Sequence, residues 1–232
     1  MANPLAVIIG VGDGLSASLA RQLHAAGYRL VLAARNADKL AGLAKATGAA
    51  TRSMDAADPA AMAALFAGLD ACPRVAIYNP SARVRGPVAE LDPEEVRRAV
   101  EITAFGAFLM GREAAKLMLE APVEDGRRGT ILFTGASAGV KGFPQSAVFA
   151  MGKFAQRGLA ESMARELHPK GIHVAWINID GGIRNPGRTE PADAPDSMLD
   201  PEAIAAAYLQ LVAQDRSAWS NEITLRPWVE RF

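Results

Sequence analysis

The feature that most constrains the fold of this chain is a regular alternation of short apolar runs with longer segments of helical periodicity. Residues 5–9 form an unbroken apolar run, which is typical of a strand buried on both faces. In the next segment Leu15, Leu19 and Leu23 recur at four-residue steps, which indicates a helix, and Gly27 ends it. Repeated units of this kind form right-handed crossovers and therefore a parallel sheet.

The same alternation continues along the rest of the chain. The predicted strands cover residues 5–9, 29–34, 49–54, 74–78, 129–134, 172–177 and 222–225. The predicted helices cover residues 15–26, 38–47, a segment that begins at 58–59, 93 to about 120, 146–168 and 201 to about 213. Segment 180–198 is rich in Gly, Pro and charged residues and is predicted to be a long loop. We therefore expect an α/β fold of Rossmann type: a doubly wound parallel sheet of about seven strands with helices on both faces. Residues 1–232 are expected to form one domain.

Composition argues against several classes of function. The 25 basic and 25 acidic residues cancel, whereas a nucleic-acid-binding protein needs a clustered basic excess. No apolar run approaches the roughly 20 residues of a membrane span, and residues 1–10 lack the basic region of a secretory signal. The lone Cys72 suits a reducing cytoplasm. His24, His168 and His173 lack metal-ligand spacing and are expected to be exposed structural residues. We expect a soluble cytoplasmic protein with no metal, nucleic-acid or membrane partner.

A glycine-rich turn separates the first predicted strand from the first predicted helix. Gly10, Gly12 and Gly14 lie in this turn. Glycines let the backbone approach a pyrophosphate closely, and the N-terminus of the following helix supplies N–H groups and a positive dipole. The strand before it and the helix after it favour a dinucleotide-binding turn over a plain strand–helix connection.

The residues that follow the second and third predicted strands indicate which dinucleotide the chain binds. An NAD-binding site usually has an acid after the second strand to hold the ribose 2′-hydroxyl, but Arg35 occupies this place. A guanidinium pairs well with a 2′-phosphate, so the cofactor is predicted to be NADP(H) rather than NAD. The alternative is that Arg35 is a surface arginine at a helix start. Asp55 could accept a hydrogen bond from the adenine amine, or it could be a turn residue.

In order and spacing, nearly all of the chain resembles the short-chain dehydrogenase/reductase family. The motifs that carry this resemblance are Gly10–Gly14, Asp55, Asn79 within Tyr78–Ser81, Lys153 within Phe149–Lys153, and Lys170–Val174. Ser16 stands where the third glycine of the family motif usually is, and Asp180-Gly181 replaces its Pro-Gly. The resemblance implies that Asn79 and Lys153 join the glycines, Arg35 and Asp55 in binding the cofactor. It also implies a homodimer or homotetramer formed through helices 93–120 and 149–168.

The catalytic positions of this family are altered. Its proton-donating Tyr corresponds to Phe149, its carbonyl-orienting Ser to Ala136 and its Asn to Thr103, and only Lys153 remains. Phe cannot donate a proton and Ala cannot polarise a carbonyl. Lys153 lies four residues after Phe149, so the two share one helix face, although Lys153 could be a solvated helix lysine and Phe149 a core residue. The resemblance therefore implies a degenerate active site.

Other groups near the predicted site could replace the missing donor. Ser137 and Ser146 are possible substitutes, but each also suits a capping or turn role. Tyr78 and Lys153 are further candidates. Several cations fall in loops on the ligand side and could hold an anionic substrate, although a solvated rim is the interpretation that we favour: Arg83, Arg85, Lys141, Arg184 and Arg188.

Two functions follow from these patterns. The first is an NADP(H)-dependent oxidoreductase with a degenerate active site, acting on an unknown small carbonyl or alcohol substrate. The alternative is a non-catalytic dinucleotide-binding protein that works as a sensor or scaffold. A purely structural subunit with an empty site is disfavoured by the glycine turn and Arg35.

Overall fold

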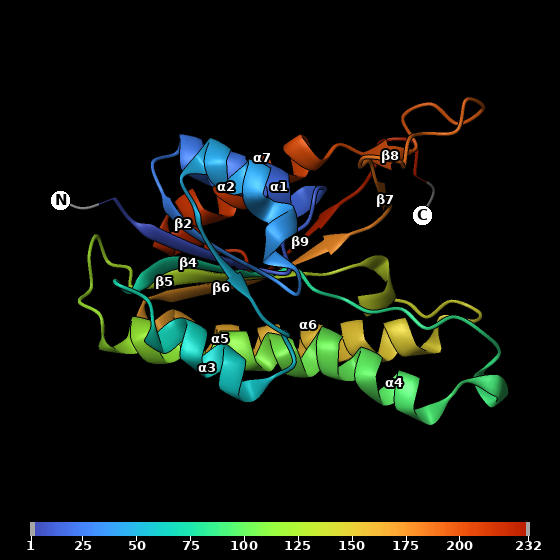
Figure 1. Ribbon diagram of the computed structural model, residues 1–232, viewed down its shortest axis with the longest axis horizontal. Coiled ribbons are helices and arrows are strands. Elements are labelled where there is room, and N and C mark those ends of the chain that lie inside the picture. Colours follow the sequence, from blue (N-terminus) through green and yellow to red (C-terminus); the bar gives the residue numbers. More distant parts are fainter. Residues whose placement is uncertain (1–2, 231–232) are drawn as a thin grey trace.

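The computed structural model describes residues 3–230 and has three layers, with a parallel sheet between two layers of helices (Figure 1). The sheet contains β1 (Leu5–Ile9), β2 (Arg29–Ala34), β3 (Ala50–Ser53), β4 (Pro73–Tyr78), β5 (Gly129–Thr134), β6 (Ile172–Ile179) and β9 (Glu222–Leu225). Their order is β3-β2-β1-β4-β5-β6-β9, and all neighbouring strands are parallel. The predicted doubly wound Rossmann-type fold is confirmed.

Helices cover both faces of the sheet, which explains the unbroken apolar runs of its central strands. One layer contains α1 (Leu15–Ala25), α2 (Ala41–Thr47) and α7 (Pro201–Ala213); the other contains α3 (Pro59–Ala67), α4 (Pro93–Val100), α5 (Gly106–Glu120) and α6 (Ala147–Leu167) (Figure 1). Every residue of β1, β5 and β6 is buried. A strand without a solvent-facing side has no reason to alternate polar and apolar residues.

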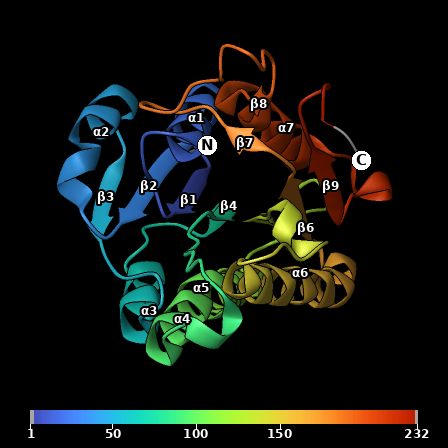
Figure 2. The same ribbon diagram turned by 90° about the vertical axis from the view of Figure 1, so that its right-hand side faces the viewer.

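The strand order reverses between β1 and β4, and this reversal positions the site. β1 pairs with β2 on one side and with β4 on the other, so the connections that follow β1 and β4 leave in opposite directions. Sheets of this kind bind ligands outside the carboxyl ends of the strands at such a switch point. Figure 2 looks onto this edge of the sheet.

The helix predicted for residues 93–120 is interrupted. Residues Glu101–Phe105 form a π-helical turn between α4 and α5, in which the Gly106 N–H donates to the Glu101 carbonyl five residues back. Gly106 has no side chain, and a Cβ there would lie far too close to the Tyr78 hydroxyl. Single π turns of this kind are frequent at functional sites.

Segment 180–198 is more ordered than the sequence suggested, which corrects the prediction of a plain loop. β7 (Gly182–Ile183) and β8 (Met198–Leu199) pair in parallel and form a separate two-stranded sheet. Strands of two residues are too short to leave a periodic pattern in the sequence. This pair lies in an arm beyond the carboxyl edge, at the upper right of Figure 1.

Aspartate side chains start three helices as predicted. The side chains of Asp58 and Asp92 each accept from two backbone N–H groups of the first turn, that of Asp200 accepts from one, and a proline follows each of them. Among residues 3–230, no helix is both long enough and apolar enough to cross a bilayer.

Candidate functional site

The glycine turn connects β1 to α1 and leaves its backbone open. Gly10 has φ +81°, and a Cβ there would lie 2.5 Å from Cγ of Pro80, so only glycine fits this position. Gly12 differs because a Cβ built on it has no neighbouring atom within 4 Å. Gly14 precedes α1 and caps it without a side chain. A phosphate group could approach this backbone and the α1 N-terminus.

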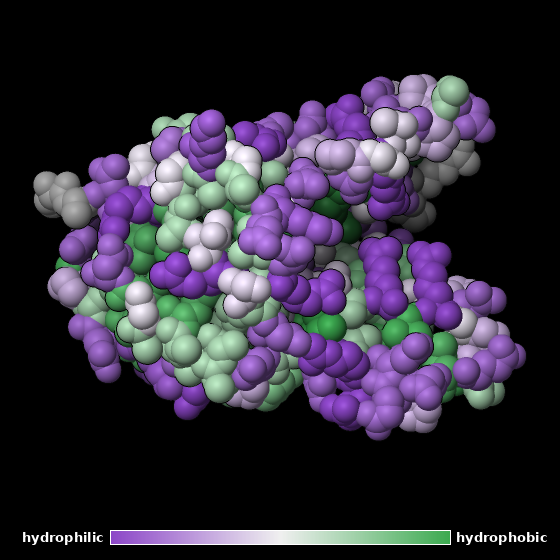
Figure 3. Space-filling view, viewed as in Figure 1, coloured by the Kyte–Doolittle hydropathy of each residue, from purple (hydrophilic) through white to green (hydrophobic). Residues whose placement is uncertain are grey.

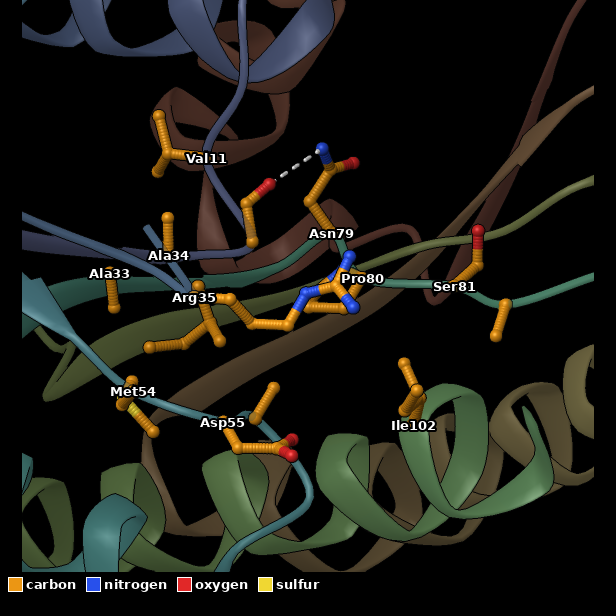
Figure 4. Close-up of a pocket in the computed structure, with 14 residues that line it drawn as sticks. Val11, Ala33, Ala34, Arg35, Met54, Asp55, Asn79, Pro80, Ser81 and Ile102 are labelled. Carbon is orange, nitrogen blue, oxygen red and sulfur yellow. Dashed lines mark hydrogen bonds between the residues drawn. The ribbon is translucent and has the colours of Figure 1, made fainter. Parts of the chain in front are cut away.

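Ser16 ties the glycine turn to the loop that follows β4. Its hydroxyl donates to the Gly10 carbonyl at 3.0 Å and accepts from the Asn79 amide. The Asn79 amide also lies 3.5 Å from the Gly10 carbonyl, the contact dashed in Figure 4. The departure from a third glycine therefore adds polar contacts that fix Asn79 at the turn.

A cavity of about 480 Å³ opens beside this turn, at the ends of β1, β2, β3 and β4. Arg35 and Asp55 both line it and approach it from neighbouring strands (Figure 4). Within residues 3–230, no acidic side chain forms an ion pair with the Arg35 guanidinium. A cation and a carboxylate at this edge could hold the polar groups of a nucleotide.

Asp55 also has the turn role that the sequence left open. Its Oδ1 accepts from the Ala57 N–H at 2.9 Å, and its other oxygen pairs with Arg98. The Ala57 N–H and the Arg98 guanidinium lower the pKa of this carboxyl. Asp55 is therefore ionised at neutral pH and structurally engaged as well as accessible from the cavity.

A second cavity continues from the glycine turn to the N-terminal part of α6. Lys153, Phe149 and Ala136 line it together, beside Gly12 and Gly14. Thr103 does not line it; this residue is buried, and its hydroxyl accepts from the Ala82 N–H. In Figure 3 the outline is notched between the arm that carries β7 and β8 and the helical layer below, and hydrophilic side chains border this notch.

Lys153 is the most unusual charged group of this cavity because only 2% of it is exposed. Its Nζ donates to the Thr134 carbonyl at 2.5 Å and to Oε1 of Gln156 at 3.2 Å. Burial, together with the nearby charge of Arg83, lowers the pKa of Lys153 to about 7. Lys153 therefore lines this cavity and is not a solvated helix lysine.

Gln156 belongs to the same polar group and was missed by sequence reasoning. Its Nε2 donates to the Thr103 carbonyl at 3.2 Å, and its Oε1 accepts from Nε1 of Trp176 at 3.3 Å as well as from Lys153. Gln156 thus connects the π-helical turn to Lys153 through buried hydrogen bonds. The available signal was its place three residues after Lys153, on the same helix face.

The remaining candidate proton donors do not reach the cavity. Ser137 and Ser146 lie on the segment between β5 and α6, outside the lining of both cavities. The Tyr78 hydroxyl donates to the Ile102 carbonyl at 2.5 Å, and burial raises the pKa of this phenol. Phe149 instead packs with Ala136 and Ala138 in a small apolar cluster. No side-chain hydroxyl therefore comes from the place of Phe149 or Ala136.

The cations that the sequence placed in loops on the ligand side do not all lie at the same site. Arg83 and Arg188 line the second cavity. Arg184 pairs with Asp200 at 3.1 Å, and the Lys141 ammonium lies over the ring of Phe143.

The expectation for the histidines is wrong for one of them. His173 is 1% exposed and stacks on Trp219, with ring centroids 4.9 Å apart. It lies at the start of β6, a strand covered on both faces, which explains its burial. Within residues 3–230 no three metal-ligating side chains gather in a cluster that could hold an ion.

Comparison with known proteins identifies the family. A family model described as short chain dehydrogenase matches residues 4–190, which is most of the chain. The chain belongs to the short-chain dehydrogenase/reductase family. An uncharacterized oxidoreductase of Staphylococcus aureus is 25% identical over 240 residues, with 98% of each chain covered. The solved structure of a short-chain dehydrogenase from Rhodopseudomonas palustris is 37% identical and superimposes with a TM-score of 0.82, covering 97% of this chain and 99% of that one. A metagenomic short-chain oxidoreductase in complex with NADP shares the fold at 23% identity, with a TM-score of 0.84 and 99% of each chain covered.

Proposed function

We propose that this chain is an NADP(H)-dependent oxidoreductase of the short-chain type whose active site lacks the usual proton donor. The observation that carries the proposal is the pair of adjoining cavities that runs from Arg35, past the glycine turn, to the buried Lys153. The NADP bound to the metagenomic relative and the NADPH bound to another structural neighbour, BdcA, support this cofactor. In this proposal the reacting molecule is a small carbonyl or alcohol compound, and residues 1–232 act as one domain in a homodimer or homotetramer.

Each proposed cofactor-binding residue has a role that its placement suits. Gly10, Gly12 and Gly14 leave room for the pyrophosphate, and Arg35 pairs with the 2′-phosphate. Asp55 accepts from the adenine amine, beside its contact to Ala57. Asn79, which donates to the Ser16 hydroxyl, contacts the cofactor beside the glycine turn. Lys153 holds the nicotinamide ribose. The bound nicotinamide supplies or accepts the hydride.

The proton has to come from an unusual source in this proposal. Phe149 and Ala136, at the family's Tyr and Ser positions, carry no exchangeable side-chain proton, and Thr103 is buried outside the lining of the cavity. The Lys153 ammonium, with a pKa lowered to about 7, is the titratable group closest to fitting the task at neutral pH. The apolar cluster around Phe149 favours the second candidate, a dinucleotide-binding sensor or scaffold without turnover.

The cofactor is tested by calorimetric titration with NADPH and NADH. NADPH should bind about 10-fold or more tightly than NADH because a charge-assisted contact to the 2′-phosphate contributes about 1.5–3 kcal/mol. Arg35→Ala should abolish this preference. Lys39→Ala removes an exposed cation of the same segment that does not line the cavity, and it should keep the preference. Equal affinities in the unmodified protein would contradict NADP specificity.

Turnover is tested by restoring the missing groups. Phe149→Tyr with Ala136→Ser places a hydroxyl four residues before Lys153 and a second one two residues after the end of β5. With NADPH and a panel of small diketones, the double variant should react at least about 10² times faster than the unmodified protein, because a general acid contributes roughly that factor. Rapid reduction by the unmodified protein would exclude the sensor candidate. A double variant that binds NADPH yet stays inert would favour it.

A further inference from the structure

The guanidinium of Arg83 lies against the face of Phe149. Arg83 belongs to the loop that follows β4, and its guanidinium carbon is 4.1 Å from the centroid of the ring. This is a close cation–π contact. Both side chains line the cavity that contains Lys153. The aromatic ring therefore holds the exposed Arg83 cation at the edge of this cavity.

This cation is one of several that have no acidic partner. Arg188 approaches the same cavity from the segment between β7 and β8, and Arg85 lies two residues after Arg83. Partial burial, followed by the charges of Arg85 and Arg188, lowers the pKa of Arg83. Within residues 3–230, none of the three forms an ion pair with a carboxylate, whereas Arg184 of the same arm pairs with Asp200.

Arg83, Arg85 and Arg188 are exposed at or near the rim of the cavity, so solvent screens part of their mutual repulsion, and an anion bound between them would relieve the rest. The phosphates of a dinucleotide belong at the glycine turn. Arg83 contacts Phe149 instead, beside Lys153, where the reacting end of a substrate would lie. A guanidinium is also well suited to carboxylate and phosphate groups, because it can bind both with two parallel hydrogen bonds.

We propose that Arg83, held against the ring of Phe149, binds a carboxylate or phosphate group of the substrate, so that this protein takes a small anionic carbonyl or alcohol compound. The inference rests on the proposed function, because it places the substrate at the Lys153 end of the cavity. It names a chemical class of substrate that the fold alone does not determine.

The test compares probes that differ only in charge. Protein saturated with NADP⁺ is titrated by calorimetry with pyruvate and its uncharged methyl ester, and with dihydroxyacetone phosphate and dihydroxyacetone. NADP⁺ cannot reduce the carbonyl group of these probes, and the absence of NADPH absorbance during the titration verifies that their hydroxyl groups are not oxidised either. At least one anionic probe should bind about 10-fold or more tightly than its neutral partner. The pair with the larger ratio distinguishes a carboxylate from a phosphate substrate.

Variants locate the effect. Arg83→Gln should remove the preference for the anionic probe and leave NADP⁺ affinity unchanged, while Arg83→Lys should keep part of the preference. Arg184→Gln, a loss of charge on the neighbouring arm outside this cavity, should keep all of it. Equal affinity for charged and neutral probes, absence of binding by every probe, or a preference that survives Arg83→Gln would overturn the proposal. A large loss of NADP⁺ affinity in Arg83→Gln would also overturn it, because Arg83 would then serve the cofactor.

The same titrations without NADP⁺ separate this inference from the proposed function. If the protein fails to bind NADP⁺ yet prefers the anionic probe through Arg83, the cofactor proposal is wrong and the anion site stands. If NADP⁺ binds normally and the probes show no charge preference, the anion site is wrong and the cofactor proposal stands.

Discussion

At the scale of single residues, Lys153 is a buried charged group that opposes stability. Its ammonium has two protein acceptors, the Thr134 carbonyl and Gln156, but almost no contact with water. Transfer of a charge from water to such a place is costly, and the lowered pKa expresses that cost. A residue chosen for packing alone would be apolar here.

The cost of burying Lys153 predicts a pH dependence of stability. The pKa is 10.5 for the unperturbed group and about 7 in the fold. Between these values the unfolded chain binds more protons than the folded one, so this residue makes stability rise with pH. Lys153→Met should therefore raise the free energy of unfolding, and this increase should be about 2–3 kcal/mol larger at pH 6.5 than at pH 9.5. Urea denaturation of the cofactor-free proteins measures this difference. The exposed Lys141→Met is the control, and parallel curves for Lys153→Met and the unmodified protein would refute the argument.

At the scale of secondary-structure elements, α6 is held against the π-helical turn by a glycine. A Cβ on Gly152 would lie 2.8 Å from Cβ of Thr103, so the close approach of the two segments requires its absence. Gly158 lies further along the same helix, is exposed and has no atom within 4 Å of a Cβ built on it. The two glycines have the same local conformation and opposite packing.

These two glycines therefore give a matched pair of stability predictions. Gly158→Ala should raise the free energy of unfolding by about 0.5–1 kcal/mol, because alanine loses less backbone entropy than glycine in a helix. Gly152→Ala should lower it by about 1–3 kcal/mol through overpacking against Thr103. Thermal and urea denaturation of both variants provide the measurement. Similar changes in the two variants would mean that helix propensity alone decides, and that the approach of α6 to Thr103 is not tight.

The sequence predicted most elements because burial on both faces and the Asp-Pro starts of helices leave local patterns. The π-helical turn left no such pattern, because its geometry depends on the contact of Gly106 with Tyr78. The β7–β8 pair left none either, because each strand depends on the other across the arm.

Some parts of the candidate site could likewise be predicted and others could not. The glycine turn and Lys153 were predicted from the order and spacing of motifs along the chain. Arg83 lies against Phe149 and Arg184 pairs with Asp200, and this difference arises only when their loops fold. Gln156 looked like an ordinary polar helix residue.

At the scale of the whole molecule, large apolar side chains remain exposed on the layer that contains α5 and α6. Phe105, Phe108, Met151 and Phe154 are each 42–54% exposed, and Phe105 stacks with Phe108 at a centroid distance of 6.1 Å. Exposed apolar residues that gather on neighbouring helices are typical of protein–protein interfaces. This layer is the one through which we propose that the protein assembles.

Light scattering should therefore detect a dimer or tetramer at micromolar concentration. Phe108→Glu combined with Phe154→Glu should dissociate it to monomers, because an interface core does not accommodate unpaired charges. Val88→Glu introduces the same charge at an exposed apolar residue that belongs to neither α5 nor α6 and should leave the assembly intact. A monomer in the unmodified protein at all accessible concentrations would exclude this mode of assembly.

The small apolar cluster of Ala136, Ala138 and Phe149 has a consequence for evolution. It is separate from the two large cores of the molecule, so its composition can change while the sheet and its helices stay intact. Gly135 and Gly139, which flank it, are constrained, since a Cβ on either would overlap the ring of Trp176. Substitution is therefore more constrained at the two flanking glycines than at Ala136 and Phe149, which line the proposed substrate cavity. Under the proposed function, a hydroxyl added at either position, as in Phe149→Tyr or Ala136→Ser, would alter the chemistry and leave the two large cores unchanged.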